Sequence, residues 1–147
     1  MTDAVRDGYD RVAKQYAELF LSDLEHQPFV RKRLAAFADQ VAPGGLVADL
    51  GCGPGHVSNF ATNLGLTTVG YDLSPATIDE ARNAFPELDF HVGDLTALEV
   101  ADHAFAGVIS RYSIIHMDPG RLGDAFTEWM RVLTPGAPVY VLSLIHI

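Results

Sequence analysis

A glycine-rich turn and an adjacent aspartate are the first residues of this chain whose types and spacing could do chemistry. Gly51, Gly53 and Gly55 follow directly after the apolar run at residues 46–50. Such a run is long enough for a buried strand and too short for a helix. Glycines right after a buried strand indicate that the backbone turns tightly and that something approaches it closely. Asp49 lies on the strand just before the turn, so the pattern predicts a ligand site with a carboxylate beside it.

Further polar residues stand at the ends of later apolar runs. Asp72 and Asp94 end two of them, and Ser110 and Arg111 end a third. Ligands of open parallel sheets bind beyond the carboxyl ends of the strands, so these side chains are expected to converge with Asp49 on one crevice. A glycine turn, a second strand and an acid at its end describe a nucleoside-binding βαβ unit.

The spacing bears on which nucleoside is bound. The dinucleotide pattern is G-x-G-x-x-G, whereas His56 stands where the third glycine of that pattern belongs. An acid at the end of the second strand serves either kind of site, because it accepts hydrogen bonds from ribose hydroxyls. Asp94 is not part of the dinucleotide pattern, and it could accept from the exocyclic amine of adenine while Leu95 packs on the ring. An NAD(P)-dependent oxidoreductase stays open as the alternative enzyme.

Several segments together resemble a known family. VADLGCGPG, VGYDLS, VGDL and the stretch ending in SIIHM are similar to the class I S-adenosylmethionine-dependent methyltransferases. The resemblance covers residues 46–143, and YDRVAKQYAELF is similar to the helix that many small-molecule members place over the cofactor. It implies methyl transfer from S-adenosylmethionine to a small-molecule acceptor, with S-adenosylhomocysteine as the product.

The resemblance also implies which residues contact the cofactor. Asp72 would accept from the ribose hydroxyls, and the glycine turn would face the methionine part. The full set is Tyr16, Asp49, Gly51, Cys52, Gly53, Asp72, Leu73, Asp94, Leu95, Ser110 and Arg111. Carboxylates around the turn suit a sulfonium cation, whereas they would repel a pyrophosphate.

Four side chains have a structural reading beside the functional one. His116 follows the fourth strand and is the candidate catalytic residue if the acceptor must lose a proton; otherwise it is an ordinary polar residue. Tyr16 is either a lid residue or part of a helix core, and Cys52 is better read as a small residue in a tight turn than as a reactive thiol. Trp129 and Phe126 are expected to pack. The six histidines show no metal-ligand spacing, so no metal site is expected.

The elements that must position these residues alternate between helix and strand. Helices are predicted at residues 3–20, 28–41, 57–64, 75–85 and 121–133, and strands at 46–50, 67–72, 88–92, 105–110 and 138–145. This alternation predicts an α/β fold, a Rossmann-like doubly wound and mostly parallel sheet with helices on both faces. The chain is expected to be a single domain at residues 1–147, with an N-terminal helical lid at 1–42 and a βα core at 46–147.

Composition narrows the partners. The formal net charge is −9, from 19 acidic and 10 basic residues, which disfavours a nucleic-acid substrate. No run approaches the roughly 18 apolar residues of a transmembrane helix, and the polar N-terminus does not resemble a signal peptide. One cysteine is compatible with a reducing cytoplasm, the expected location.

The sequence ends inside an apolar strand, at LSLIHI. The family's sheet normally continues with a helix and an antiparallel hairpin, so the chain is expected to be C-terminally truncated and to leave a sheet edge exposed. A homodimer that pairs this edge is one way to cover it. A catalytically incompetent fragment that only binds the cofactor stays open as well.

Overall fold

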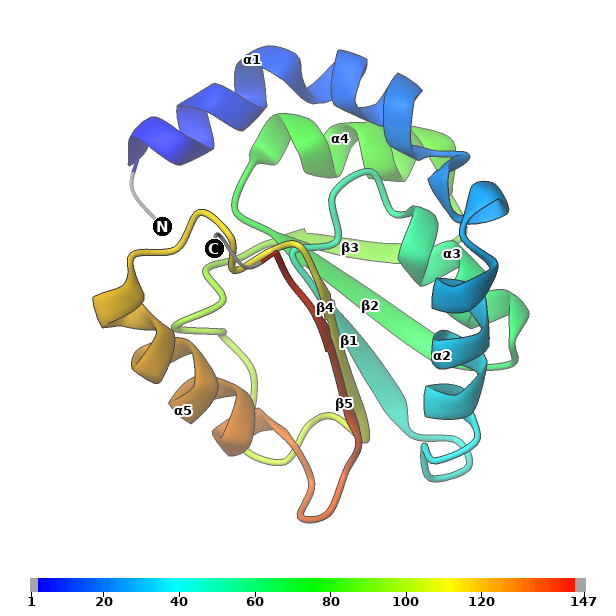
Figure 1. Ribbon diagram of the computed structural model, residues 1–147. Helices are drawn as coiled ribbons and strands as arrows, with labels where there is room; N and C mark the ends of the chain where they lie inside the picture. The colour runs from blue at the N-terminus through cyan, green and yellow to red at the C-terminus, as the bar shows by residue number, and fades with distance from the viewer. Residues whose placement is uncertain (1–2, 145–147) are drawn as a thin grey trace.

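The chain folds into a five-stranded parallel sheet, and the computed structural model describes residues 3–144 (Figure 1). The strands are β1 (Leu46–Leu50), β2 (Thr67–Asp72), β3 (Asp89–Val92), β4 (Gly107–Arg111) and β5 (Val139–Leu142). They pair in the order β3-β2-β1-β4-β5, and every neighbouring pair is parallel. Strand order reverses between β1 and β4, which places the switch point at their carboxyl ends. The predicted Rossmann-like α/β fold is confirmed.

Helices cover both faces of this sheet. They are α1 (Asp3–Phe20), α2 (Pro28–Ala38), α3 (His56–Asn63), α4 (Pro75–Ala84) and α5 (Leu122–Val132), with short 3₁₀ turns η1 (Asp23–His26) and η2 (Pro119–Arg121). Trp129 of α5 is buried against one face, whereas Phe37 of α2 and Ala61 of α3 are buried against the other. Figure 1 shows α5 across the sheet from α2 and α3, with α1 lying over α4.

The turn after β1 requires glycine at its first position. The amide nitrogens of Gly51 and Cys52 both donate to the carbonyl oxygen of Tyr71, at 2.8 and 3.0 Å, so the β1–β2 ladder continues into the turn. Gly51 has φ 78°, and a Cβ built there would overlap the Cβ of Ser113. The chain therefore turns sharply at the point where the loops after β1 and β4 meet.

The start of α4 is capped by a side chain. Ser74 is its N-cap, and the Oγ of Ser74 accepts a hydrogen bond from the amide of Thr77 at 3.1 Å. Pro75 occupies the first turn, where its missing N–H costs nothing. This cap fixes the loop that carries Asp72 and Leu73.

The most deeply buried face of α1 is not its stripe of large apolar residues. The stripe of Val5, Tyr9, Val12, Tyr16 and Leu19 leaves Val12 and Leu19 41% and 73% exposed.

The buried residues of α1 are Ala13 and Ala17. Asp10 shares their face at helical spacing, and its Oδ1 accepts from the amide of Ala76 at 3.2 Å, at the start of α4. Small side chains let α1 approach α4 closely, so the larger apolar side chains are left facing outward. Of the two N-terminal helices expected as a lid, only α1 lines the pocket described below, because α2 packs on the sheet.

Some predicted element ends are wrong by a few residues. α2 ends at Ala38 rather than 41, because the amides of Gln40 and Val41 donate to carbonyls three residues back, as in a 3₁₀ turn. β4 begins at Gly107, since Phe105 instead forms an isolated bridge with Leu133.

β5 ends at Leu142, and the predicted end at Ile145 lies outside the described residues. Residues 95–104 form the predicted loop.

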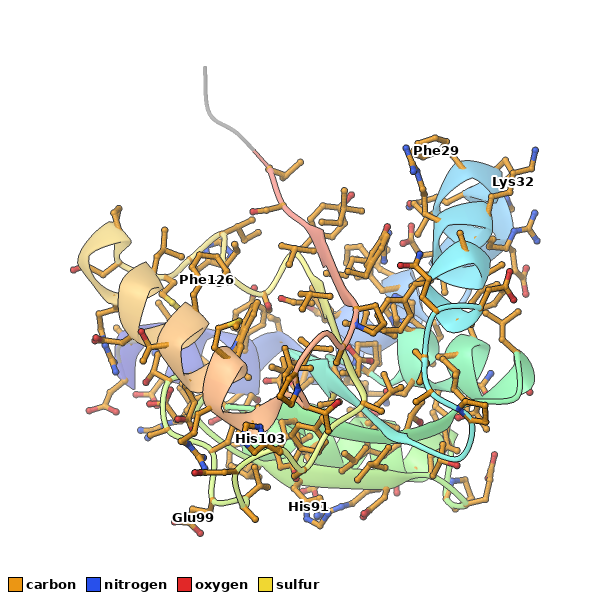
Figure 2. The ribbon with its side chains drawn as sticks, turned by 90° about the horizontal axis from the view of Figure 1, so that it is seen from below. Phe29, Lys32, His91, Glu99, His103 and Phe126 are labelled. Atoms are coloured by element: carbon orange, nitrogen blue, oxygen red, sulfur yellow. The ribbon has the colours of Figure 1, made fainter. Side chains whose placement is uncertain are left out.

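β5 lies at one edge of the sheet and is apolar and partly exposed. Val139 and Val141 are 45% and 42% exposed, and Phe126 and Met130 of the neighbouring α5 are 44% and 71% exposed. The prediction that Phe126 packs is therefore only half right: its ring meets Trp129 edge-on, but much of it faces solvent. Figure 2 shows Phe126 projecting from α5 on this side of the sheet. Within residues 3–144, no helix has both the length and the apolar character needed to cross a membrane.

Candidate active site

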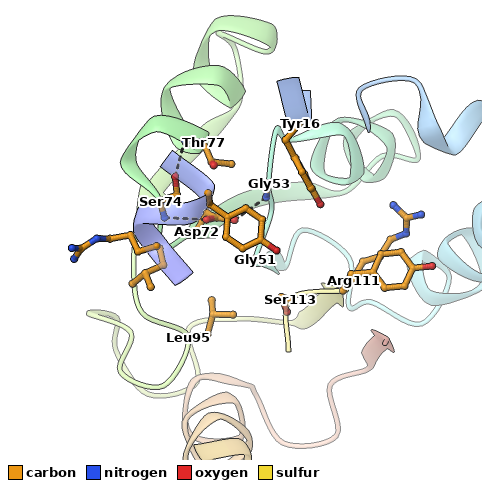
Figure 3. Close-up of a pocket in the computed structure, with 13 residues that line it drawn as sticks. Tyr16, Gly51, Gly53, Asp72, Ser74, Thr77, Leu95, Arg111 and Ser113 are labelled. Carbon is orange, nitrogen blue, oxygen red and sulfur yellow. Dashed lines mark hydrogen bonds between the residues drawn. The ribbon is translucent and has the colours of Figure 1, made fainter. Parts of the chain in front are cut away.

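A pocket lies beyond the carboxyl ends of β1, β2 and β4, with α1 above it (Figure 3). The turn after β1, the end of β2, the end of β4 and the tyrosines of α1 all contribute to its walls. The predicted site residues that line it are Tyr16, Gly51, Gly53, Asp72, Leu73, Leu95 and Arg111. The expected crevice at the switch point therefore exists, and most of the predicted residues meet there.

Asp72 is held in place by backbone amides. Its Oδ2 accepts from the amide of Gly53 and its Oδ1 from the amide of Ser74, each at 3.0 Å. Burial raises the pKa of Asp72, the amides of Ser74 and Gly53 oppose the rise, and the carboxylate of Asp10 adds to it. An ionised carboxylate has about four acceptor positions, so two backbone bonds leave room for ligand hydroxyls.

Ser74 connects Asp72 to α1. Its amide donates to Asp72, whereas its hydroxyl donates to Oδ1 of Asp10. Asp10 also accepts from the amide of Ala76. This end of α1 is therefore fixed to the start of α4, directly beside the acid at the end of β2.

Arg111 stands across the glycine turn from Asp72 and is almost fully buried, with its side chain 4% exposed. Its Nη2 donates to Oδ2 of Asp23 at 2.6 Å and to Oε1 of Gln27 at 2.9 Å. Its Nη1 lies 3.2 Å from Nε2 of His56. Figure 3 shows Arg111 and Asp72 on opposite sides of Gly51, with the hydroxyl of Tyr16 pointing toward the Arg111 side.

The two tyrosines of α1 fill much of the space over the turn. Their rings meet edge-on with centroids 5.8 Å apart, and a Cβ on Gly53 would lie 3.5 Å from the Tyr16 ring. Burial, followed by the neighbouring Tyr16 and Asp72, raises the pKa of Tyr9 to about 12, so this hydroxyl stays protonated at neutral pH. The cavity left between the lining side chains is about 40 Å³. Sites for nucleoside-sized ligands measure several hundred Å³, so α1 or its tyrosines must move to admit one.

Asp49 and Cys52 lie beneath the turn rather than in the pocket, which corrects their expected positions. Oδ2 of Asp49 accepts from the hydroxyl of Ser58 on α3 at 2.7 Å, and the residue is 1% exposed. Burial raises the pKa of Asp49 to about 6 despite that hydrogen bond. The Cys52 thiol points toward Gly70, and burial raises its pKa well above the ordinary value, so it stays a thiol. Cys52 is thus a small buried residue, as its structural reading predicts.

Ser110 and Asp94 also lie outside the pocket lining. The hydroxyl of Ser110 is hydrogen-bonded to that of Ser113 and is buried under the β4 loop. Oδ1 of Asp94 accepts from the amide and the hydroxyl of Thr96, at 2.9 and 2.7 Å. Asp94 therefore closes its own turn and faces a separate hollow beside Tyr71, while its neighbour Leu95 lines the main pocket.

His116 is exposed and borders a second, shallower hollow on α1. This hollow of about 440 Å³ is lined by His116 and by Val5, Gly8, Tyr9, Val12 and Tyr16. The rings of His116 and Tyr9 lie with centroids 5.8 Å apart. Because Tyr9 and Tyr16 border both spaces, the hollow adjoins the main pocket. The outward apolar face of α1 is what lines it.

Sequence reasoning missed several residues of the site. Arg6, Thr77, Tyr112 and Ser113 line the pocket without having been singled out. Asp23 and Gln27, which hold Arg111, carry no local motif.

Tyr112 has a positive φ of 58° just after β4, an unusual backbone conformation that the sequence does not reveal. Among the described residues, no group of three or more His, Cys, Asp or Glu side chains is arranged to hold a metal ion.

Comparison with known proteins identifies the family. The profile of a family described as "Methyltransferase domain" matches residues 47–136. This chain belongs to that family, the class I S-adenosylmethionine-dependent methyltransferases. The matched region runs from β1 through α5 and so contains the glycine turn, Asp72 and Arg111.

Individual relatives of this methyltransferase domain agree in fold and differ in acceptor. A demethylmenaquinone methyltransferase of Renibacterium salmoninarum is 30% identical over 115 residues, which is 78% of this chain and 48% of the relative. A human protein named probable tRNA methyltransferase 9B is 33% identical over 123 residues, 83% of this chain and 26% of that protein. A crystal structure of a Pyrococcus horikoshii OT3 protein superposes with a TM-score of 0.69 at 31% identity, covering 87% of this chain and 66% of that one. The chain spans about half the length of the first of these relatives.

Proposed function

We propose that this chain is an S-adenosylmethionine-dependent methyltransferase that acts on a small-molecule acceptor. The observation that carries the proposal is the pocket at the switch point, which has a partly satisfied carboxylate, Asp72, at one end and a buried cation, Arg111, at the other. A nucleoside with an amino-acid tail carries ribose hydroxyls that could donate to Asp72 and a carboxylate that could pair with Arg111.

The lining residues fit this cofactor. Asp72 would accept from the ribose hydroxyls through its remaining acceptor positions. Leu73 and Leu95 would hold the adenine between them, and the methionine part would lie over Gly51 and Gly53 toward Arg111, under Tyr16. The remaining predicted residues would support the site indirectly, by fixing the turns that carry the contacting residues. They are Asp49, Cys52, Asp94 and Ser110.

The protein's task in methyl transfer is mainly alignment. The cofactor supplies a methyl group on a sulfonium, a good leaving group. The residues of α1 would exclude water and hold the acceptor in line with that methyl group. A proton acceptor is needed only where the acceptor's nucleophile is protonated, and His116 borders the hollow where it would be required.

The acceptor is proposed to be a small, largely apolar molecule. Among residues 3–144, the hollow beside the pocket is lined by valines, tyrosines, Gly8 and His116, with no Asp, Glu, Lys or Arg side chain. The relatives' names include both a quinone and a tRNA acceptor, so names alone do not decide. A net charge of −9 opposes an RNA phosphate backbone, which favours the small molecule.

An activity assay tests the proposal. Methyl-labelled S-adenosylmethionine is incubated with the protein and either a panel of hydroquinones and phenols or bulk tRNA. Label is expected in the small molecules. Label in tRNA alone would overturn the acceptor class, and binding without transfer to any acceptor would support the incompetent-fragment alternative.

His116→Gln provides a second comparison in the same assay. Removal of a proton acceptor typically slows turnover by about 10²- to 10⁴-fold. His116→Gln should therefore lower kcat in this range and leave S-adenosylhomocysteine affinity unchanged. His91→Gln, on the exposed β3 edge, is the matched control and should leave kcat unchanged.

The assembly is proposed to be a homodimer of single-domain chains in the cytoplasm. The exposed valines of β5 support an edge-to-edge pairing, which across a two-fold axis would be antiparallel. Val141→Lys should dissociate the dimer in sedimentation equilibrium, whereas Leu19→Lys on α1 should not. A monomeric unmodified protein would overturn this part of the proposal.

A further inference from the structure

The guanidinium of Arg111 joins the sheet to the segment after α1. It comes from the end of β4, and through Nη2 it holds Asp23 and Gln27, at either end of η1. Asp23 and Gln27 are also bonded to each other at 2.8 Å, from Nε2 of Gln27 to Oδ1 of Asp23. Arg111 therefore helps to set the position of η1, together with the buried side chain of Leu24.

His56 completes the surroundings of Arg111. A guanidinium only donates hydrogen bonds, so Nε2 of His56 must accept from Nη1 at 3.2 Å. Burial, followed by the charge of Arg111, lowers the pKa of His56 to about 4, which keeps the ring neutral and able to accept. The neutral His56 ring therefore adds no charge beside Arg111, and the guanidinium keeps its ion pair with Asp23.

One donor of Arg111 has no partner. Within the described chain, the Nε–H of Arg111 is buried and makes no hydrogen bond. Buried donors of a charged group are rarely left unpaired, because the lost hydration is not replaced. An unpaired donor on a residue that lines the pocket points to an acceptor that arrives with a ligand.

The place of Arg111 in the pocket says which part of a ligand that is. Asp72 and Arg111 lie on opposite sides of the glycine turn (Figure 3). A nucleoside whose ribose is held by Asp72 therefore directs its other end toward Arg111. The other cation of the lining, Arg6, is 39% exposed and already paired with Asp3 and Asp7.

We propose that Arg111 recognises the carboxylate of the cofactor's amino-acid part through Nε–H while its Nη2 keeps Asp23 and Gln27, so that cofactor binding and docking of η1 are coupled. This inference rests on the proposed function. Since the cavity between the lid tyrosines and the turn is only about 40 Å³, α1 or its tyrosines must move when a ligand enters, and any movement of the end of α1 requires the contact between Asp23 and Arg111 to be remade. A ligand that fixes the guanidinium of Arg111 therefore favours the state in which Asp23 and η1 are docked on it.

A matched pair of ligands tests the recognition step. S-adenosylhomocysteine carries the amino-acid part, whereas methylthioadenosine shares its adenosine and thioether and lacks the carboxylate. By calorimetry, Arg111→Met should weaken S-adenosylhomocysteine about 10- to 100-fold, as expected for a charge-assisted hydrogen bond, and methylthioadenosine less than about threefold. Asp23→Asn, which keeps Arg111, should leave the ratio of the two affinities unchanged within about threefold.

Two outcomes separate this inference from the proposed function. If unmodified protein binds neither ligand, the proposed function fails. If it binds both and Arg111→Met weakens both equally, Arg111 is only structural and the inference is overturned.

The unmodified protein gives a test that does not depend on the variant folding. It should bind S-adenosylhomocysteine at least about 10-fold more tightly than its decarboxylated analogue, and equal affinities would overturn the inference.

Hydrogen exchange tests the coupling. S-adenosylhomocysteine should slow amide exchange in residues 21–28 more than a saturating concentration of methylthioadenosine does. Equal protection by the two ligands would show that docking of η1 is independent of the ligand's carboxylate, and would overturn the coupling.

Discussion

The two ends of the pocket are built in different ways. At one end, Asp72 is held by the amides of Gly53 and Ser74, both from loops that follow strands of the sheet. At the other, Arg111 is held by Asp23 and Gln27, which belong to the segment after α1. The amides that hold Asp72 come from the sheet's own loops, whereas the partners of Arg111 come from the N-terminal segment, so the second end is complete only when that segment is docked. A ligand that spans both ends therefore contacts Asp72, which is held by loops of the sheet, and Arg111, whose partners lie on the movable N-terminal segment.

The largest loss of stability is expected from a substitution in the glycine turn beside Asp72. Gly51→Ala introduces a Cβ that overlaps the Cβ of Ser113, at a residue with φ 78°. It should destabilise the fold by about 4 kcal/mol in urea unfolding, from steric overlap and backbone strain together.

Gly65→Ala is the matched control for that prediction. Gly65 has φ 93° but nothing lies within 4 Å of a Cβ built there. The cost should be about 1 kcal/mol, for the backbone conformation alone. Equal costs for the two variants would mean that the contact with the β4 loop does not constrain the turn.

The difference between the two ends also explains what sequence could predict. The glycine turn, Asp72 and the Ser74 cap are local signals, in which a few consecutive residues determine the backbone, and the structure contains all of them. Asp23 and Arg111 are separated by 88 positions, and no short pattern announces their pairing.

The buried face of α1 is set by contacts of the same long-range kind. Apolar periodicity correctly indicates a helix, but the close approach of Asp10, Ala13 and Ala17 to α4 decides which side is buried. The predicted contact of Asp94 with the cofactor stays a prediction, and its Oδ1 already accepts from Thr96 in a local turn, a common use of aspartate.

The next largest effect concerns ligand binding at the fixed end. Asp72→Asn removes the charge and one acceptor from a site already holding two amides, so it should weaken S-adenosylhomocysteine and methylthioadenosine alike, each by about 100-fold. Calorimetry on both ligands measures this. Because ribose is common to the two ligands, a loss confined to one of them would contradict the assignment of Asp72. Asp39→Asn, on the exposed end of α2, is the control and should bind both normally.

Two buried groups behind the pocket should also respond oppositely to acid. His56, beside Arg111, has a pKa lowered to about 4, so the unfolded chain takes up its proton first as pH falls from about 6.5. Its contribution therefore destabilises the fold on acidification, until about pH 4. Asp49, beneath the turn, has a pKa raised from 3.8 to about 6, so the folded protein takes up its proton first below pH 6. Its contribution stabilises the fold on acidification, until about pH 3.8.

Variants separate these opposing contributions. The quantity to compare is the free energy of unfolding at pH 4.5 minus that at pH 7. His56→Gln should raise this difference by about 2 kcal/mol relative to the unmodified protein. Asp49→Asn should lower the same difference. Urea unfolding at the two pH values measures both, and changes of the same sign in the two variants would contradict the assignment.

The smallest effect is expected at the movable end. Asp23→Asn keeps an acceptor for Arg111 but removes the opposite charge from a pair whose acid is 21% exposed, so it should cost about 1 kcal/mol of stability. Thermal unfolding measures this loss. Asp102→Asn removes one of two acidic partners of the more exposed Arg131, which keeps Glu128, and should cost less. A larger loss for Asp102 than for Asp23 would contradict the view that Arg111 is the junction of sheet and N-terminal segment.

The central claim is that the two ends together form a site for S-adenosylmethionine, and calorimetric titration of the unmodified protein tests it most directly. S-adenosylhomocysteine should bind one-to-one with a Kd on the order of micromolar, about −8 kcal/mol, while NAD gives no saturable heat at the same concentrations. Saturable binding of NAD with no heat from S-adenosylhomocysteine would contradict the claim.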